Sequence, residues 1–212
     1  MSLAAFCPTE GSARSVCTAA PYAEVAAEQP GDARGEAIVR RLAARFREMP
    51  DYEAVFRIEG GSFEMSGRYA VSGEAYYLAV EGAEVFCDGA GRFEVNKRLQ
   101  EVTVETVSRE SRNLLDNPTR AFDFADSAYA PRFAGERNGE LRVQLTPLPG
   151  SDGASGTVTV VVSAATGDPV RIEYDYDGDT LAIQLLSVRP SSAPLPRFSA
   201  ANYPGYEFID FR

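Results

Sequence analysis

Residues 51–107 read DYEAVFRIEGGSFEMSGRYAVSGEAYYLAVEGAEVFCDGAGRFEVNKRLQEVTVETV, and the alternation within this stretch decides the fold. Apolar side chains recur at every second position between short turns such as Gly60-Gly61, Ser72-Gly73 and Asp88-Gly89. A period of two is typical of half-buried strands, and turn pairs at this spacing are typical of hairpins. The stretch therefore predicts an antiparallel meander in which consecutive strands pair.

The same rhythm continues in the second half of the chain, where Asn138-Gly139, Gly167-Asp168 and Asp177-Gly178 supply the turns. A last strand-like run covers 206–212. About eleven connected strands of this kind form a barrel or a strongly bent sheet. The fold class is therefore mainly β with few helices. Further strands are predicted at 131–137, 140–148, 156–164, 168–176 and 179–188.

Residues 32–49 hold the only long helical pattern. Asp32 is suited to cap its N-terminus, and Pro50 ends it because proline forces its neighbour out of the α region. The apolar residues recur three or four apart, which places them on one stripe. That stripe consists of Ile38, Leu42, Phe46 and Met49.

Residues 108–127 interrupt the strands. Asn117-Pro118 is a good start for a short helix, because proline is favoured at the first helical position. The insert is also partly apolar, through Leu114, Leu115, Phe122 and Phe124. The helix and the insert are expected to cover one face of the sheet, and a wide barrel can leave an apolar cavity beneath such a cover.

Residues 1–31 are rich in small residues, proline and glycine and are expected to form a flexible segment. They fit the remnant of a truncated signal peptide, with Gly11-Ser12-Ala13 as the cleavage site, or alternatively a disordered cytosolic tail. Cys7 and Cys17 are able to pair if the protein is exported. Cys87 lies in an apolar run and is expected to be buried.

The composition excludes several classes of protein. The 212 residues contain no histidine, and 21 Lys and Arg stand against 31 Asp and Glu, so the net charge is −10. Without histidine, Ser-His-Asp triads and His-ligated zinc sites are impossible. The acidic balance argues against nucleic-acid binding. No P-loop, dinucleotide-binding or nucleophile-elbow motif is present, so we expect no enzyme, no catalytic residues and no cofactor.

A weak calcium-like pattern occurs at Asp175, Asp177 and Asp179. The glycine is out of place, and the distal acidic position of an EF-hand loop falls on Leu186. An ordinary hairpin turn explains these residues, so no metal site is expected.

Several local motifs occur in a family-like order over residues 32–212. The order begins with the helix and an alternating run. The most informative motif that follows them is the Asp-Gly turn and aromatic strand at 87–93. In this order the chain resembles the LolA-like lipoprotein carriers (LolA/LolB-type half-barrels). The other motifs are Ser66-Gly67-Arg68-Tyr69, Leu145-Thr146-Pro147, Asp177-Gly178-Asp179-Thr180, Phe198, Pro204-Gly205 and Ile209-Asp210.

The resemblance implies an unclosed antiparallel β-barrel with a lid over an apolar cavity. It implies a monomeric periplasmic carrier that takes acylated lipoproteins from an inner-membrane ABC transporter to an outer-membrane receptor. The alternative is a lipid- or lipoprotein-binding sensor module that does not shuttle its ligand. The family's arginine that holds the lid has no counterpart, because Ser72-Gly73 occupies its place and Arg68 falls on the other strand face.

The inward aromatic and aliphatic residues are the candidates for the cavity lining. For each of them the alternative is ordinary core packing. The candidates are Leu42, Phe46, Phe56, Ile58, Phe63, Met65, Tyr69, Phe86, Phe93, Phe122 and Phe124.

Overall fold

The computed structural model describes residues 32–125, 128–151, 156–176 and 179–212. Over these ranges it contains one sheet of 12 strands, an α-helix and two short 3-10 helices. The helices are α1 (Ala33–Arg47), η1 (Pro118–Arg120) and η2 (Ala200–Asn202). The predicted helices at 32–49 and after Asn117 are confirmed. Residues 1–31, with Cys7 and Cys17, lie outside the described part, as do Asp177 and Gly178.

The strands follow the predicted runs closely. The first six are β1 (Asp51–Gly60), β2 (Phe63–Ser72), β3 (Ala75–Val80), β4 (Ala83–Cys87), β5 (Gly91–Asn96) and β6 (Glu101–Thr106). The others are β7 (Tyr129–Arg137), β8 (Glu140–Pro147), β9 (Thr157–Ser163), β10 (Pro169–Tyr176), β11 (Asp179–Pro190) and β12 (Glu207–Asp210).

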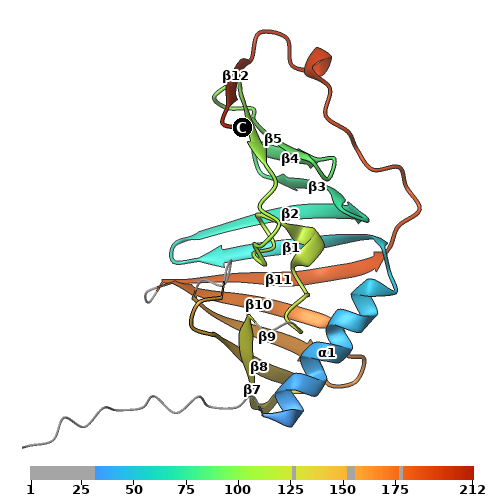
Figure 1. Cartoon of the computed structure of the whole chain (residues 1–212), viewed down its shortest axis with the longest axis vertical. Helices are drawn as coiled ribbons and strands as arrows, with labels where there is room; N and C mark the ends of the chain where they lie inside the picture. The colour runs from blue at the N-terminus through green and yellow to red at the C-terminus, as the bar shows by residue number, and fades with distance from the viewer. Residues whose placement is uncertain (1–31, 126–127, 152–155, 177–178) are drawn as a thin grey trace, which may run out of the picture.

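Two meanders meet in the middle of the sheet (Figure 1). The strand order is β12-β6-β5-β4-β3-β2-β1-β11-β10-β9-β8-β7, so the first meander runs outward from β1 and the second returns to β11. β1 and β11 pair antiparallel from Tyr52–Pro190 to Gly60–Leu181. The described strands β7 and β12 end the sheet without pairing with each other, so the unclosed half-barrel is confirmed. One pairing differs from the expected antiparallel pattern, because β12 runs parallel to β6.

The connection from β6 to β7 covers one face of this sheet. The chain leaves β6 near one end of the strand order and enters β7 at the other end, so it has to traverse the sheet. Residues 107–125, the crossover segment, pass over the same face as α1 (Figure 1). We call this the inner face; in β1 it carries Ala54, Phe56 and Ile58.

Helix α1 begins against the edge strand β7. The Asp32 carboxylate accepts the N–H of Gly35 at 2.6 Å, as an N-cap does, and also the N–H of Phe133. The Asp32 N–H donates to the Pro131 carbonyl at 3.0 Å. A Cβ on Gly35 would lie 2.9 Å from the Phe133 nitrogen, so glycine allows this close approach. The helix thereby satisfies part of an otherwise open sheet edge.

Replacing Asp32 by alanine is expected to lower the melting temperature at neutral pH, and the loss is expected to shrink on acidification. The N–H groups of Gly35 and Phe133 hold the pKa of Asp32 below its ordinary value. A carboxyl group with a depressed folded pKa stabilises the fold above its unfolded pKa, about 3.9, and this contribution disappears as pH falls through the folded pKa. Thermal melts from pH 7 to about pH 2 measure the difference. A difference that stays constant with pH would contradict this account, and Asp32→Asn, which keeps one acceptor, is the control.

The sheet buries different faces at its two ends. Across β1–β4 and β8–β11 the apolar side chains point inward, toward α1 and the crossover segment. From β3 to β6 a second cluster lies on the outer face, beneath residues 191–206, the C-terminal segment. The members of the second cluster are Tyr77, Phe86, Val95, Val102 and Val104, with Phe93, Leu195, Phe198, Tyr203 and Tyr206 packed against them.

Candidate functional site

Most of the predicted lining residues lie together on the inner face. The floor is formed by the buried side chains of Phe56, Ile58 and Tyr69, each at most 1% exposed. Helix α1 and the crossover segment close over this floor. The predicted residues in this cluster are Leu42, Phe56, Ile58, Tyr69, Phe122 and Phe124, with Phe46 and Met65 partly buried against it.

The structure corrects the position of three predicted lining residues. Phe86 and Phe93 belong to the outer cluster, where Phe93 stacks on Phe198 with ring centroids 4.4 Å apart. Phe63 is 48% exposed at the start of β2, with its ring against Gly60. Alternation alone placed all three inward. For Phe86 and Phe93 it missed that the C-terminal segment covers the far end of the sheet from outside. Phe63 does alternate with Met65 and Tyr69, but it lies at the β1–β2 hairpin, beyond the covered part of the face.

Gly67 shapes the floor. A Cβ at this position would collide with the Phe56 ring and would lie 2.9 Å from the Ala79 carbonyl oxygen. The Phe56 ring therefore lies across β2 in the space that a side chain would fill. This gives a physical reason for the glycine in the strand motif at 66–69.

Helix α1 and the crossover segment contact each other as well as the sheet. The rings of Phe46 and Phe122 stack with centroids 4.0 Å apart and an interplanar angle of 17°. The Arg47 guanidinium lies 3.1 Å from the Asp123 carboxylate. Since the Phe46 ring also meets Tyr52 edge-on at 5.1 Å, the two covering elements and the floor form one packed unit.

Three tyrosines of the sheet hold the backbone of the crossover segment. The hydroxyl of Tyr52 donates to the Pro118 carbonyl at 3.1 Å, and that of Tyr76 donates to the Asp116 carbonyl at 2.8 Å. The hydroxyl of Tyr174 donates to the Arg112 carbonyl at 3.2 Å and accepts the Leu114 N–H at 3.0 Å. Alternation does not predict these contacts, since an inward tyrosine has the same sequence pattern as any other aromatic core residue.

Burial keeps the hydroxyls of Tyr52 and Tyr76 in the protonated, donating form. Burial raises the pKa of Tyr52, Tyr69 and Tyr76 above the ordinary value. Arg68 lies on the outer face, as alternation predicted, with its guanidinium 5.6 Å from the centre of the Tyr77 ring. Arg68 therefore takes no part in holding the crossover segment, and the tyrosines fill that role.

The crossover segment has internal structure of its own. The buried Arg112 guanidinium donates from Nε to the Asp123 carbonyl at 3.1 Å and from Nη1 to the Glu110 carbonyl at 2.8 Å. The Asn117 side chain accepts the Thr119 N–H and donates to the Ser108 carbonyl. These bonds tie the segment's two ends together, so it is suited to move as a unit.

The apolar hollows of the closed structure are small. One of about 240 Å³ lies between the end of α1 and the crossover segment, next to Phe46, Tyr52 and Phe122. A larger hollow of about 460 Å³ is lined by charged residues that include Glu74, Arg109 and Glu110. Binding pockets for drug-sized ligands usually measure roughly 300–1,000 Å³. The apolar interior beneath α1 and the crossover segment is therefore largely filled by side chains.

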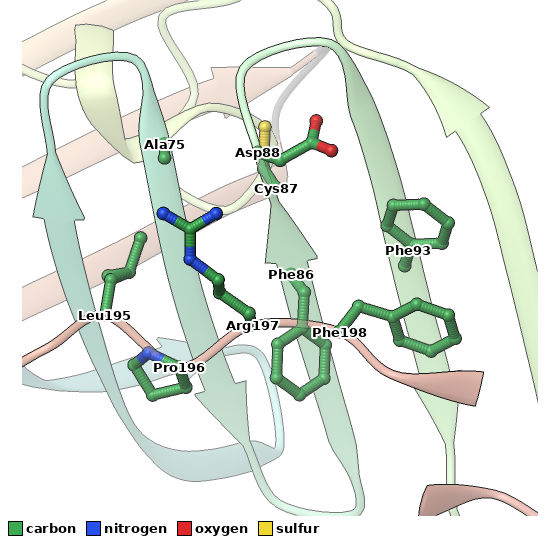
Figure 2. A pocket seen from close by; sticks show the side chains of 9 residues that line it. All are labelled: Ala75, Phe86, Cys87, Asp88, Phe93, Leu195, Pro196, Arg197 and Phe198. Carbon is green, nitrogen blue, oxygen red and sulfur yellow. The ribbon is translucent and has the colours of Figure 1, made fainter. Parts of the chain in front are cut away.

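A second apolar hollow, of about 200 Å³, lies on the outer face (Figure 2). The rings of Phe86, Phe93 and Phe198 form one wall, and Leu195 and Pro196 lie across the strands. The C-terminal segment is held there by aromatic contacts and by the Tyr203 hydroxyl, 3.4 Å from Glu84. This hollow is separate from the inner face and is too small for an acyl chain.

Neither a metal centre nor a membrane-spanning helix is found in the described ranges. No group of three or more His, Cys, Asp or Glu side chains there is arranged to hold a metal ion. No helix in the same residues is long and apolar enough to cross a membrane. Cys87 is buried, as predicted.

Comparison with known proteins supports the fold. No protein-family model matches the sequence, and no curated protein gives a significant match. An uncharacterized conserved protein from Thermus thermophilus is similar in structure, with a TM-score of 0.53 at 8% identity over 84% of this chain and 99% of the other.

Two further solved structures are similar with lower scores. A LolA superfamily protein from Nitrosomonas europaea has a TM-score of 0.41 at 9% identity, over 80% of this chain and 96% of its own. An outer-membrane lipoprotein-sorting protein domain, described as putative, from Vibrio parahaemolyticus has a TM-score of 0.44 at 10% identity, over 81% and 96%. Likenesses at such identities concern the fold alone.

Proposed function

We propose that this protein binds the acyl chains of lipoproteins on its inner face and carries them through the periplasm. The observation that supports this proposal is the apolar inner face. The crossover segment that covers it forms no strand pairing with the sheet. The described crossover residues form no strand, and tyrosine hydroxyls and apolar side chains hold them to the sheet. Such a cover can lift without breaking the strand ladder, which a reversible carrier requires.

The size of the apolar face suits this role. Each methylene removed from water contributes roughly 0.8 kcal/mol, so a carrier of acyl chains needs a long apolar surface. The inner face offers one across β1–β4 and β8–β11. The proposed contacts with the chain are Leu42, Phe46, Phe56, Ile58, Met65, Tyr69, Phe122 and Phe124.

The wider proposal follows the resemblance. In this proposal residues 32–212 form the carrier domain. The protein acts as a monomer without a cofactor, receives lipoproteins from an inner-membrane ABC transporter and delivers them to an outer-membrane receptor. A non-shuttling sensor would bind the same ligands without releasing them.

The test compares two substitutions to aspartate. Met65→Asp puts a charge on the inner face opposite Ile58 and is expected to weaken binding of a fluorescent fatty acid at least about 10-fold, because burying an unpaired charge is costly. Val55→Asp, at a 44% exposed outer position of β1 opposite Arg68, is the matched control and is expected to bind normally. Equal affinity in the two folded variants would contradict the assignment of the inner face.

Shuttling is tested separately by mixing the purified protein with spheroplasts of a two-membrane bacterium. A carrier is expected to release lipoproteins into the soluble fraction as one-to-one complexes. Fatty-acid binding without release would favour the sensor module. Absence of both would show that the inner face is only a core.

A further inference from the structure

Four tyrosines form a row across the inner face, on β3, β2, β1 and β10. Three of them already donate to carbonyl oxygens of the crossover segment, at 2.8–3.2 Å. The row therefore recognises carbonyl groups in the closed protein. We call it the tyrosine row; its members are Tyr52, Tyr69, Tyr76 and Tyr174.

The fourth member, Tyr69, has a buried hydroxyl that the closed structure does not use. Tyr69 is 1% exposed, and its oxygen has no hydrogen-bond partner of acceptable geometry in the described residues. The Tyr52 hydroxyl is its polar neighbour, and that hydroxyl already donates its own proton to the Pro118 carbonyl. Its ring lies 5.8 Å from that of Tyr52 and 5.9 Å from that of Phe56. An unsatisfied hydroxyl in a core lowers stability, and phenylalanine would fill the same space without this cost. The hydroxyl is thus a donor available for something absent from the closed state.

We propose that the tyrosine row binds the ester or amide carbonyls of an acylated ligand, in place of the crossover carbonyls. This inference rests on the proposed function and specifies its substrate class. A hydrocarbon chain alone satisfies the apolar floor but leaves the hydroxyls without acceptors once the crossover segment lifts. An acyl chain attached through an ester or amide carbonyl satisfies both the apolar floor and the tyrosine hydroxyls, since these donors lie next to the apolar side chains.

The exchange also explains how opening and binding are coupled. When the segment lifts and an acyl chain covers the face, the hydroxyls of Tyr52, Tyr76 and Tyr174 have lost their carbonyl partners and are shielded from water, and buried donors left unpaired are costly. Ligand carbonyls restore these bonds, and Tyr69 gains one that the closed state lacks. The ligand therefore has a differential interaction with the open state, which a shift in population requires.

The test uses two lipids that differ only in the carbonyl. Dioctanoylglycerol is a diester, and dioctylglycerol ether has the same chain length with no carbonyl. Each competes with a fluorescent fatty acid for the purified full-length protein. The wild-type protein is expected to prefer the ester by about 3-fold to 10-fold, the effect of one or two hydrogen bonds.

Tyr69→Phe is the decisive variant. It is expected to lose most of the ester preference while its melting temperature stays nearly unchanged, because the Tyr69 hydroxyl makes no hydrogen bond of acceptable geometry in the closed state. Tyr77→Phe, whose hydroxyl donates to Glu84 on the outer face at 2.6 Å, is the matched control and is expected to keep the preference.

The outcomes separate this inference from the proposed function. Displacement by both lipids with equal affinity, or an unchanged preference in Tyr69→Phe, would overturn the role of the row while leaving acyl-chain binding intact. Displacement by neither lipid would overturn the proposed function and this inference with it. A large drop in the melting temperature of Tyr69→Phe would show that the hydroxyl is structural, which also overturns the inference.

Discussion

Replacing Phe56 by alanine is expected to destabilise the protein by about 3–5 kcal/mol and to lower its melting temperature by roughly 6–20 °C. The Phe56 side chain is fully buried, and its ring occupies the space that a side chain at position 67 would otherwise take. The cavity would open at the centre of the sheet, where β1 meets both β2 and β11. The strand pairings on both sides of β1 prevent the neighbouring side chains from filling this cavity. The loss of stability is therefore expected at the upper end of the usual range. Calorimetry or a circular-dichroism melt measures it.

Phe63→Ala is the matched control for that experiment. The substitution removes the same ring from the next strand, but at a site that is 48% exposed. A loss of about 0.5 kcal/mol is expected there, as for most surface substitutions. Similar losses at the two positions would show that burial on the inner face does not set the stability of β1 and β2.

Removing the hydroxyls of Tyr52, Tyr76 and Tyr174 together is expected to free the crossover segment. Each hydrogen bond contributes about 0.5–1.5 kcal/mol, so loss of the set shifts the opening equilibrium by roughly 10-fold to 1,000-fold. The triple phenylalanine variant keeps the rings and therefore the packing. Hydrogen exchange at the amides of Asn117 and Ala121, which bond within the crossover segment, is expected to accelerate by that factor.

Amides of the β10–β11 ladder give the internal reference, because local opening leaves them protected. Tyr77→Phe again serves as the control hydroxyl, on the outer face. Unchanged exchange at Asn117 in the triple variant would show that apolar packing of Leu114, Phe122 and Phe124 closes the segment without the hydroxyls. Equal acceleration in the ladder would indicate global destabilisation and would equally refute a local closure by tyrosines.

The two experiments probe different parts of one arrangement. Phe56 belongs to the floor, which is continuous with the strand ladders and is expected to unfold only with the whole domain. The crossover segment is attached by side-chain contacts, and we expect it to open at lower free energy. A carrier needs this difference, since its binding surface has to stay folded while its cover moves.

Local sequence determined the elements of this fold. The period of two set the strands, and the glycine-bearing turns set the hairpins, because these signals act over a few residues. Asp32 caps α1 and Asn117 caps η1 as expected, since capping depends only on the nearest backbone N–H groups.

Tertiary structure alone decided which face each strand buries at the far end of the sheet. Alternation identifies two faces of a strand but does not say which is covered, and the cover comes from chain far away in sequence. The crossover segment closes the inner face because β6 and β7 lie far apart in the strand order, and the C-terminal segment closes the outer face over Phe86 and Phe93. The tyrosine contacts arise in the same way, because each hydroxyl meets a backbone carbonyl 40 to 66 residues away along the chain.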